Sequence, residues 1–143
     1  MTVKAILAVK GSGVVTIEPT VNVGAAARLL AERRIGALVV TGPDRRVVGI
    51  ISERDIVRAF AERGQAVNDA PLTEVMTRKV ITCAPSDTIS ALMERMTTGK
   101  FRHLPVIEQG RLAGLISIGD VVKRRLHEME SEQAALRDYI QTA

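Results

Sequence analysis

The chain has 143 residues and a mass of 15.5 kDa, enough for one domain or for two very small units that share a core. Hydrophobic residues make up 46% of the sequence and charged residues 25%, which excludes a disordered or collagen-like chain. Cys83 is the only cysteine, so an internal disulfide framework and a thiolate metal cluster are excluded. Because no apolar run reaches the roughly 18 residues of a membrane-spanning helix and no signal-peptide core opens the chain, we expect a cytoplasmic protein without a membrane partner.

The net charge of +4 is mild and spread along the chain. No run of five basic residues occurs, and aromatic residues make up only 2%. Neither a DNA-binding tail nor a stacking surface for single-stranded nucleic acid is therefore expected. Only the sequence pI of about 9.7 favours a nucleic-acid ligand, and local cationic pockets for a phosphorylated small molecule are the simpler interpretation.

The sequence contains two copies of one pattern. Each copy opens on a short β-branched run that a proline ends, at residues 14–17 and 80–83, and these runs predict strands. Asn22 and Thr88 follow at matching positions, where a polar side chain can accept hydrogen bonds from the free amides at a helix start. Apolar residues at helical spacing come next in both copies.

A second and a third strand complete each copy. Their predicted ranges are 37–41 and 47–52 in the first copy, and 103–107 and 112–117 in the second. The third strand ends at Ser52 or Ser117, and each serine is placed to cap a second helix. The order in each copy is therefore β-α-β-β-α, which makes the predicted fold class α/β (α+β).

Neither copy can cover a core by itself, because one apolar face of its sheet would stay exposed. We expect the copies to pack as a pseudo-twofold pair, the first at residues 1–63 and the second at residues 64–126. A short helical lead-in is predicted at the start of each copy, at residues 3–7 and 72–76.

The tail at residues 127–143 predicts a C-terminal helical extension. Apolar positions leading into it and along it alternate in steps of four and three with one polar break, as in a coiled coil. They are Val122, Leu126, Met129, Gln133, Leu136 and Ile140. Two interpretations remain open: the helix packs on its own domain, or it contacts a second subunit. The second is favoured, since little core remains to be covered so late in the chain.

Two segments carry a resemblance to a known family. Residues 36–57, GALVVTGPDRRVVGIISERDIV, and residues 102–122, RHLPVIEQGRLAGLISIGDVV, resemble the halves of a CBS-domain pair, also called a Bateman module. The resemblance extends from Val3 to about Leu126, so the chain looks like a stand-alone member. It implies two clefts that bind AMP, ADP, ATP, S-adenosylmethionine or NAD, with magnesium only alongside ATP. It also implies a homodimer.

A Ser-x-x-Asp pattern recurs where a strand gives way to a helix, at Ser52 and Asp55 and again at Ser117 and Asp120. A carboxylate there can accept hydrogen bonds from the vicinal hydroxyls of a ribose, and exposed helix amides favour a nearby phosphate. The resembled family uses this aspartate for ribose. The alternative is that both pairs only cap their helices, but two equivalent copies favour ligand contact.

The resemblance further implies that each cleft combines the aspartate of one copy with strands of the other. The first cleft is expected to contain Ser52, Arg54, Asp55, Lys79, Val80, Phe101, Arg102 and His103. The second is expected to contain Lys10, Gly13, Val14, Val15, Ile35, Gly36, Ser117 and Asp120. The main chain near Val80 or Val14 would contact the adenine edge. Because the first cleft is richer in cationic side chains, we expect it to bind a phosphorylated ligand more tightly.

The sequence contains no familiar enzyme motif: a phosphate-binding loop, a His-Glu-x-x-His metal pattern and a Gly-x-Ser-x-Gly elbow are all missing. We therefore expect a regulatory module, not an enzyme, that senses adenine nucleotides and transmits the ligand state to an unidentified downstream protein. The alternatives are a constitutive dimerisation scaffold with vestigial clefts and, on the pI alone, a nucleic-acid binder.

Overall fold

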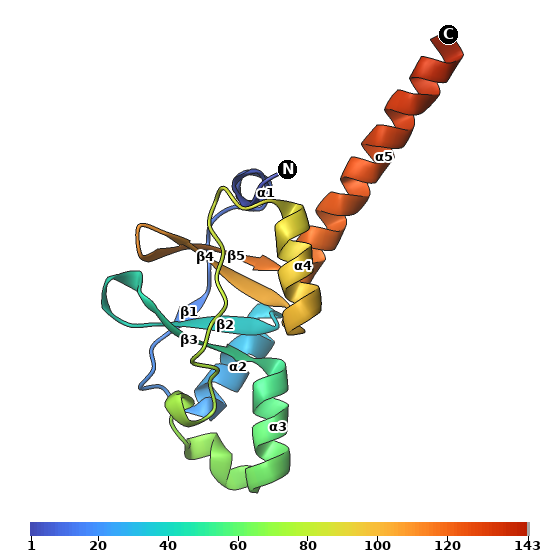
Figure 1. Cartoon of the computed structure of the whole chain (residues 1–143). Coiled ribbons are helices and arrows are strands. Elements are labelled where there is room, and N and C mark those ends of the chain that lie inside the picture. Colours follow the sequence, from blue (N-terminus) through green and yellow to red (C-terminus); the bar gives the residue numbers. More distant parts are fainter. Residues whose placement is uncertain (143) are drawn as a thin grey trace.

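A computed structural model describes residues 1–142 of the chain (Figure 1). The helices are α1 (Val3–Lys10), α2 (Val23–Arg33), α3 (Glu53–Arg63), α4 (Ile89–Gly99) and α5 (Ile118–Thr142). The strands are β1 (Thr16–Ile17), β2 (Ala37–Thr41), β3 (Val47–Ser52), β4 (His103–Glu108) and β5 (Arg111–Ser117). Short 3-10 turns lie at Pro43–Arg45, Gly64–Asp69 and Leu72–Glu74. The predicted α/β fold class is confirmed.

The predicted starts of the first helix of each copy are confirmed by hydrogen bonds from the capping residues. The Oδ1 atom of Asn22 accepts a hydrogen bond from the amide of Ala25 at 2.8 Å. The Oγ1 atom of Thr88 accepts one from the amide of Ala91 at 3.1 Å. Each bond satisfies one of the free amides of a first helical turn, so α2 and α4 begin at equivalent positions of the two copies.

The strands form two separate sheets. β1 pairs in parallel with β2, and β2 pairs antiparallel with β3, which gives the order β1-β2-β3. β4 and β5 form an antiparallel pair. The strand predicted at residues 80–83 is not formed, and a single bridge between Cys83 and Val106 stands in its place. This bridge is the counterpart of the parallel pair formed by Ile17 and Val40 in the first copy.

Local hydrogen bonds explain why the predicted strand at residues 80–83 is reduced to one bridge. The amide of Val80 donates to the carbonyl of Arg78 at 3.0 Å, and the amide of Ala84 donates to the carboxylate of Asp87 at 2.8 Å. Both bonds turn the backbone locally instead of extending it along a neighbouring strand. Only Cys83, between these turns, stays beside β4.

The molecule has two hydrophobic cores, and the lead-in segments are exchanged between them. Val3 and Ile6 of α1 are buried in the core of the second copy. Leu72 and Met76, in the lead-in of the second copy, are buried in the core of the first. Each copy therefore completes its core with the lead-in of the other.

Two glycines make room for the exchanged segments. A Cβ atom at Gly114 in β5 would lie 2.7 Å from Cδ2 of Leu7, and a Cβ atom at Gly49 in β3 would lie 2.7 Å from Sδ of Met76. A methyl group at either position would have to displace the side chain of Leu7 or Met76 in a close-packed interior, so glycine gives the closest fit at both. The glycines occupy equivalent places in the two copies, which matches the expected pseudo-twofold pairing.

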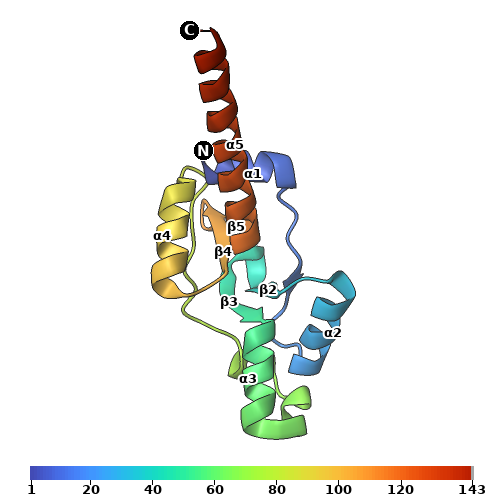
Figure 2. The same cartoon turned by 90° about the vertical axis from the view of Figure 1, so that its right-hand side faces the viewer.

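α5 continues from Ser117 as one helix and projects from the body of the molecule in both views (Figure 1, Figure 2). Val121 is the one residue of this helix that is fully buried over the described range. The apolar residues of the predicted seam are exposed, from 45% for Met129 to 64% for Ile140. The helical extension is confirmed, and the interpretation in which this seam packs on its own domain is wrong.

Candidate ligand-binding site

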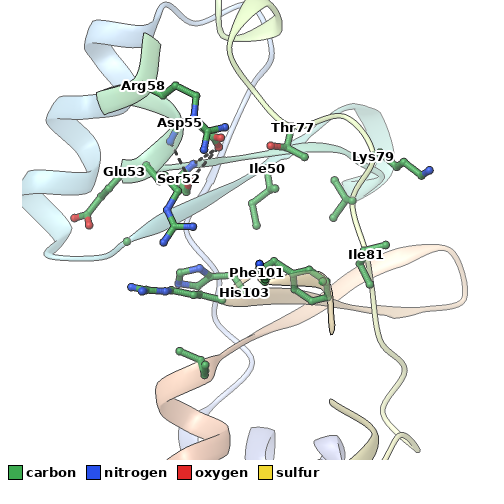
Figure 3. Close-up of a pocket in the computed structure, with 17 residues that line it drawn as sticks. Ile50, Ser52, Glu53, Asp55, Arg58, Thr77, Lys79, Ile81, Phe101 and His103 are labelled. Atoms are coloured by element: carbon green, nitrogen blue, oxygen red, sulfur yellow. Dashed lines mark hydrogen bonds between the residues drawn. The ribbon is translucent and has the colours of Figure 1, made fainter. Parts of the chain in front are cut away.

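A cavity of about 790 Å³ lies where the two copies meet, and we call it the Asp55 cleft (Figure 3). Its wall contains the end of β3, the start of α3, the segment around Lys79, and the start of β4. All eight residues predicted for the first cleft line it: Ser52, Arg54, Asp55, Lys79, Val80, Phe101, Arg102 and His103. Figure 3 shows Ser52 and Asp55 on one side and Phe101 and His103 on the other.

The Asp55 carboxylate caps α3 with only one of its two oxygens. Its Oδ2 atom accepts hydrogen bonds from the amide of Ser52 at 2.9 Å and from the hydroxyl of Ser52 at 3.0 Å. The Ser52 hydroxyl in turn accepts a bond from the amide of Asp55 at 3.3 Å, which completes a capping box. The Oδ1 atom makes no hydrogen bond to any residue between 1 and 142. Helix capping and ligand contact are therefore compatible at this side chain.

Cationic side chains outnumber carboxylates around the Asp55 cleft. The cations are Arg54, Arg58, Lys79, Lys100 and Arg102, whereas the carboxylates are Glu53 and Asp55. Within the described part of the chain, none of these five cations forms an ion pair. The cleft thus presents a net positive surface that can attract an anionic group.

Sequence reasoning missed two of these cations, Arg58 and Lys100. Arg58 follows Arg54 by four residues in α3, so helical spacing places both on the same face as the cleft. That signal was available in the sequence. Lys100 ends α4 in a left-handed conformation with φ of 56°, and no sequence pattern indicates that its side chain reaches the cleft.

Part of the lining of the Asp55 cleft is an apolar wall. It is formed by Ile50, Val80, Ile81, Phe101 and Ile118. In residues 1–142, the amide of Ile81 and the carbonyl of Val80 make no hydrogen bond, so this stretch of main chain offers one donor and one acceptor beside apolar side chains. A planar heterocycle with polar edges fits such a wall.

The imidazole of His103 lies between the copies at the edge of the Asp55 cleft. Gly36 of the first copy approaches it closely, because a Cβ atom at Gly36 would lie 3.5 Å from Cε1 of the ring. Burial, together with the positive charge of nearby Lys10, lowers the pKa of His103 below its ordinary value of 6.5. The ring is therefore uncharged at neutral pH.

Around the second Ser-x-x-Asp pair, a side chain of the protein already binds the carboxylate. The Lys10 ammonium donates to Oδ2 of Asp120 at 2.5 Å and to the carbonyl of Leu115 at 2.7 Å. The same oxygen accepts the amide of Ser117 at 2.9 Å. Burial raises the pKa of Asp120, but the hydrogen bonds from Lys10 and Ser117 outweigh it and lower the pKa below its ordinary value.

The residues predicted for the second cleft are not all brought together. Lys10 and Asp120 line a second cavity of about 600 Å³ between α1 and α5, whereas Gly36 lines the Asp55 cleft. The others, which line neither of these two cavities, are Gly13, Val14, Val15, Ile35 and Ser117. The two Ser-x-x-Asp pairs therefore differ, since Asp55 faces an open cationic cavity and Asp120 is held by Lys10.

The fold and the site together define a protein built from a duplicated β-α-β-β-α unit with a cleft where the copies meet. A family model described as "CBS domain" matches residues 6–62 and 72–127. The chain therefore belongs to the CBS-domain family, and two CBS repeats cover most of its 143 residues.

Two relatives show the extent of the similarity. "CBS domain-containing protein CBSX3, mitochondrial" of Arabidopsis thaliana is 36% identical over 120 residues, which are 81% of this chain and 58% of that protein. The chain thus spans little more than half the length of this relative. The CBS-domain-containing protein ATU1752 from Agrobacterium tumefaciens has 50% identity and a TM-score of 0.85, and the match covers 87% of this chain and 99% of that structure.

Structural relatives bind adenosine-containing ligands. The protein PAE2072 from Pyrobaculum aerophilum was solved in complex with AMP, and it matches with a TM-score of 0.75 and 31% identity over 84% of this chain and 89% of its own. The CBS-domain pair of protein MJ0100 was solved with 5′-methylthioadenosine and S-adenosyl-L-methionine. It matches with a TM-score of 0.76 and 26% identity over 86% of this chain and 98% of its own.

No helix within residues 1–142 is both long and apolar enough to cross a membrane. The Arabidopsis relative is mitochondrial, so the cytoplasmic location stays a prediction.

Proposed function

We propose that this chain is a regulatory module that binds an adenine nucleotide in the Asp55 cleft and transmits the ligand state to a partner protein. The observation that carries the proposal is the unpaired Oδ1 atom of Asp55 beside a cavity with five cationic side chains. The AMP complex of the relative PAE2072 supports this class of ligand. Within this proposal the repeats comprise residues 1–63 and 64–126, and residues 127–143 form the extension.

In this proposal each part of the nucleotide contacts a different part of the cleft. The ribose hydroxyls donate to Asp55, whose ionised carboxylate makes charge-assisted hydrogen bonds. The adenine lies against the apolar wall and pairs with the main chain of Val80 and Ile81. The phosphates lie among the cations, with Arg54, Arg58 and Arg102 as donors of paired hydrogen bonds.

The charge of the cleft favours a phosphorylated ligand. Five cations against two carboxylates attract AMP, ADP, ATP or NAD and disfavour S-adenosylmethionine, which carries a positive sulfonium group. We therefore rank the phosphorylated ligands first and keep S-adenosylmethionine as the weaker candidate. Magnesium would accompany ATP only.

The Asp55 cleft is proposed as the tighter of the two sites. The Lys10 ammonium already neutralises the Asp120 carboxylate, whereas no cation within residues 1–142 pairs with Asp55. Ligand binding then bridges the two copies, because residues of both line the Asp55 cleft. Such bridging can favour one arrangement of the copies over another and so change a surface that a partner reads.

Calorimetric titration with AMP tests the proposal. Asp55→Asn keeps an amide oxygen that can cap α3 but removes the charge, and we expect AMP affinity to fall about tenfold or more, since a hydrogen bond to a charged group contributes roughly 1.5–3 kcal/mol. Arg58→Ala should weaken AMP binding several-fold without disturbing the helix cap. Arg28→Ala, an exposed arginine of α2 outside the cleft, is the matched control and should bind AMP as the wild type does.

Two outcomes would contradict the proposal in different ways. Equal losses in Asp55→Ala and Asp120→Ala would remove the ranking of the two sites. A wild-type protein that shows no rise in melting temperature with AMP, ADP, ATP, NAD or S-adenosylmethionine would leave the constitutive scaffold as the better interpretation, because a ligand of the native state must stabilise it. Salt-dependent DNA binding would instead support the nucleic-acid alternative.

A further inference from the structure

The seam of α5 is an apolar face with no covering element over residues 1–142. Leu126, Leu136 and Ile140 are exposed by 54%, 59% and 64%. α5 contacts the rest of the molecule mainly through a neighbouring side of the helix, where Val121 is buried and Glu128 pairs with the N-terminal amino group at 3.8 Å. The CBS-domain match ends at residue 127, so most of the seam lies beyond the repeats.

We propose that α5 forms a parallel two-stranded coiled coil with α5 of a second copy of this chain. The seam positions alternate in steps of four and three over 19 residues of the helix, from Val122 to Ile140, which is the spacing that lets two helices interlock side chains. The inference is independent of nucleotide binding, since it uses only the tail helix.

Charges beside the seam select the parallel orientation. In a parallel pair, the residue that directly precedes Leu126 or Gln133 in the seam faces the residue five positions later in the partner helix. Arg125 then faces Glu130 of the partner subunit, and Glu132 faces Arg137 of the partner subunit. Both contacts join opposite charges, and twofold symmetry repeats each of them.

The antiparallel pair with full overlap brings like charges together. That register places Leu126 against Leu136 of the partner subunit. It then sets Lys123 beside Arg137 of the partner subunit, Glu130 beside its own copy, and Glu132 beside its own copy. All three contacts are repulsive, so the charge pattern disfavours this orientation.

Gln133 gives a second, independent reason for the parallel orientation. It is the one polar residue of the seam, and in a parallel pair it meets Gln133 of the partner subunit, so the two amides can hydrogen-bond to each other. In the antiparallel pair it would face Met129 of the partner subunit and lose that partner. A single polar pair in a coiled-coil core fixes the register at some cost in stability.

Disulfide trapping on the full chain tests the orientation. Leu136→Cys places two sulfurs opposite each other only in the parallel pair, and we expect this variant to form a covalent dimer under mild oxidation. The wild-type chain is the control, since its single cysteine, Cys83, is buried. Cross-linking confined to mixtures of Leu126→Cys and Leu136→Cys would overturn the proposal, because those residues meet only in the antiparallel pair.

Sedimentation equilibrium tests the charge pattern. Glu132→Arg and Arg137→Glu should each weaken dimerisation about tenfold, because each reverses both symmetry-related contacts, and the double variant should restore it. Asp138→Lys on the far face of α5 is the matched control and should leave the dimer unchanged. A monomer at every concentration, or a dimer that both single reversals leave unaffected, would overturn the proposal.

Discussion

Asp55 caps α3 through one oxygen of its carboxylate and leaves the other available for the proposed ligand. Oδ2 is occupied by the amide and hydroxyl of Ser52, while Oδ1 stays unpaired among residues 1–142. Asp120 sits in the same Ser-x-x-Asp pattern and accepts the same backbone bond, but the second contact to its Oδ2 comes from the distant Lys10 ammonium. A shared motif therefore does not give equal sites, because one long-range side chain changes what the second carboxylate can bind.

His103 should make the stability of the protein depend on pH. Its pKa lies below 6.5 in the folded chain, because burial and the positive charges of Lys10 and Arg102 outweigh the opposing effects of Asp120 and Glu53. The unfolded chain therefore takes up the proton first as the pH falls. The contribution of His103 to the free energy of unfolding is complete above pH 6.5 and is lost as the pH falls toward the lower pKa of the folded state.

Urea unfolding near pH 7.5 and near pH 5 measures this effect. We expect the wild type to lose more stability between the two conditions than His103→Gln, which cannot titrate. Equal losses in the two proteins would show that burial does not lower the pKa of this imidazole.

At the scale of elements, the contact between α1 and β5 depends on the absence of a side chain at Gly114. We expect Gly114→Ala to lower the free energy of unfolding by about 1–3 kcal/mol, because the added methyl group overpacks the core against Leu7. Gly119→Ala is the matched control, since a Cβ atom there would lie at an ordinary 3.6 Å from Oγ of Ser117. Denaturant unfolding checks both, and a Gly114→Ala protein as stable as the control would contradict the packing argument.

At the scale of the whole molecule, the exchanged lead-ins tie the two copies into one unit. Deletion of residues 1–10 should destabilise the second copy more than the first, because Val3, Ile6 and Leu7 belong to the core around β4 and β5. Hydrogen exchange measures this, and we expect amides of β5 to lose protection before those of β2. Earlier loss in β2 would show that α1 supports the first copy instead.

The two ends of the proposed dimer differ from each other. A parallel coiled coil of α5 places both CBS-repeat modules at the same end of the assembly, since α5 leaves each module at Ser117 (Figure 2). Both Asp55 clefts then lie at that end, and the tips of the two tails form the other. A change in one module can reach the other only through that end or through the shared coil.

Much of the local structure could be predicted from the sequence alone, because its causes are local. The caps at Asn22 and Thr88, strands such as 37–41 and 47–52, and the tail helix follow from hydrogen bonding and side-chain spacing within a few residues. Duplication of the pattern, read with the family resemblance, was enough to group eight residues that now line one cavity. Their role in binding stays a prediction.

Other features were decided by contacts between distant parts of the chain. Leu7 packs against Gly114, and Lys10 binds Asp120. Lys100 lines the Asp55 cleft. No local sequence pattern relates the residues in these contacts. The strand expected at residues 80–83 is also replaced by turns, which are closed by hydrogen bonds to the carbonyl of Arg78 and the carboxylate of Asp87. Secondary structure is set by near neighbours, whereas which side chain reaches a given carboxylate depends on how the whole chain packs.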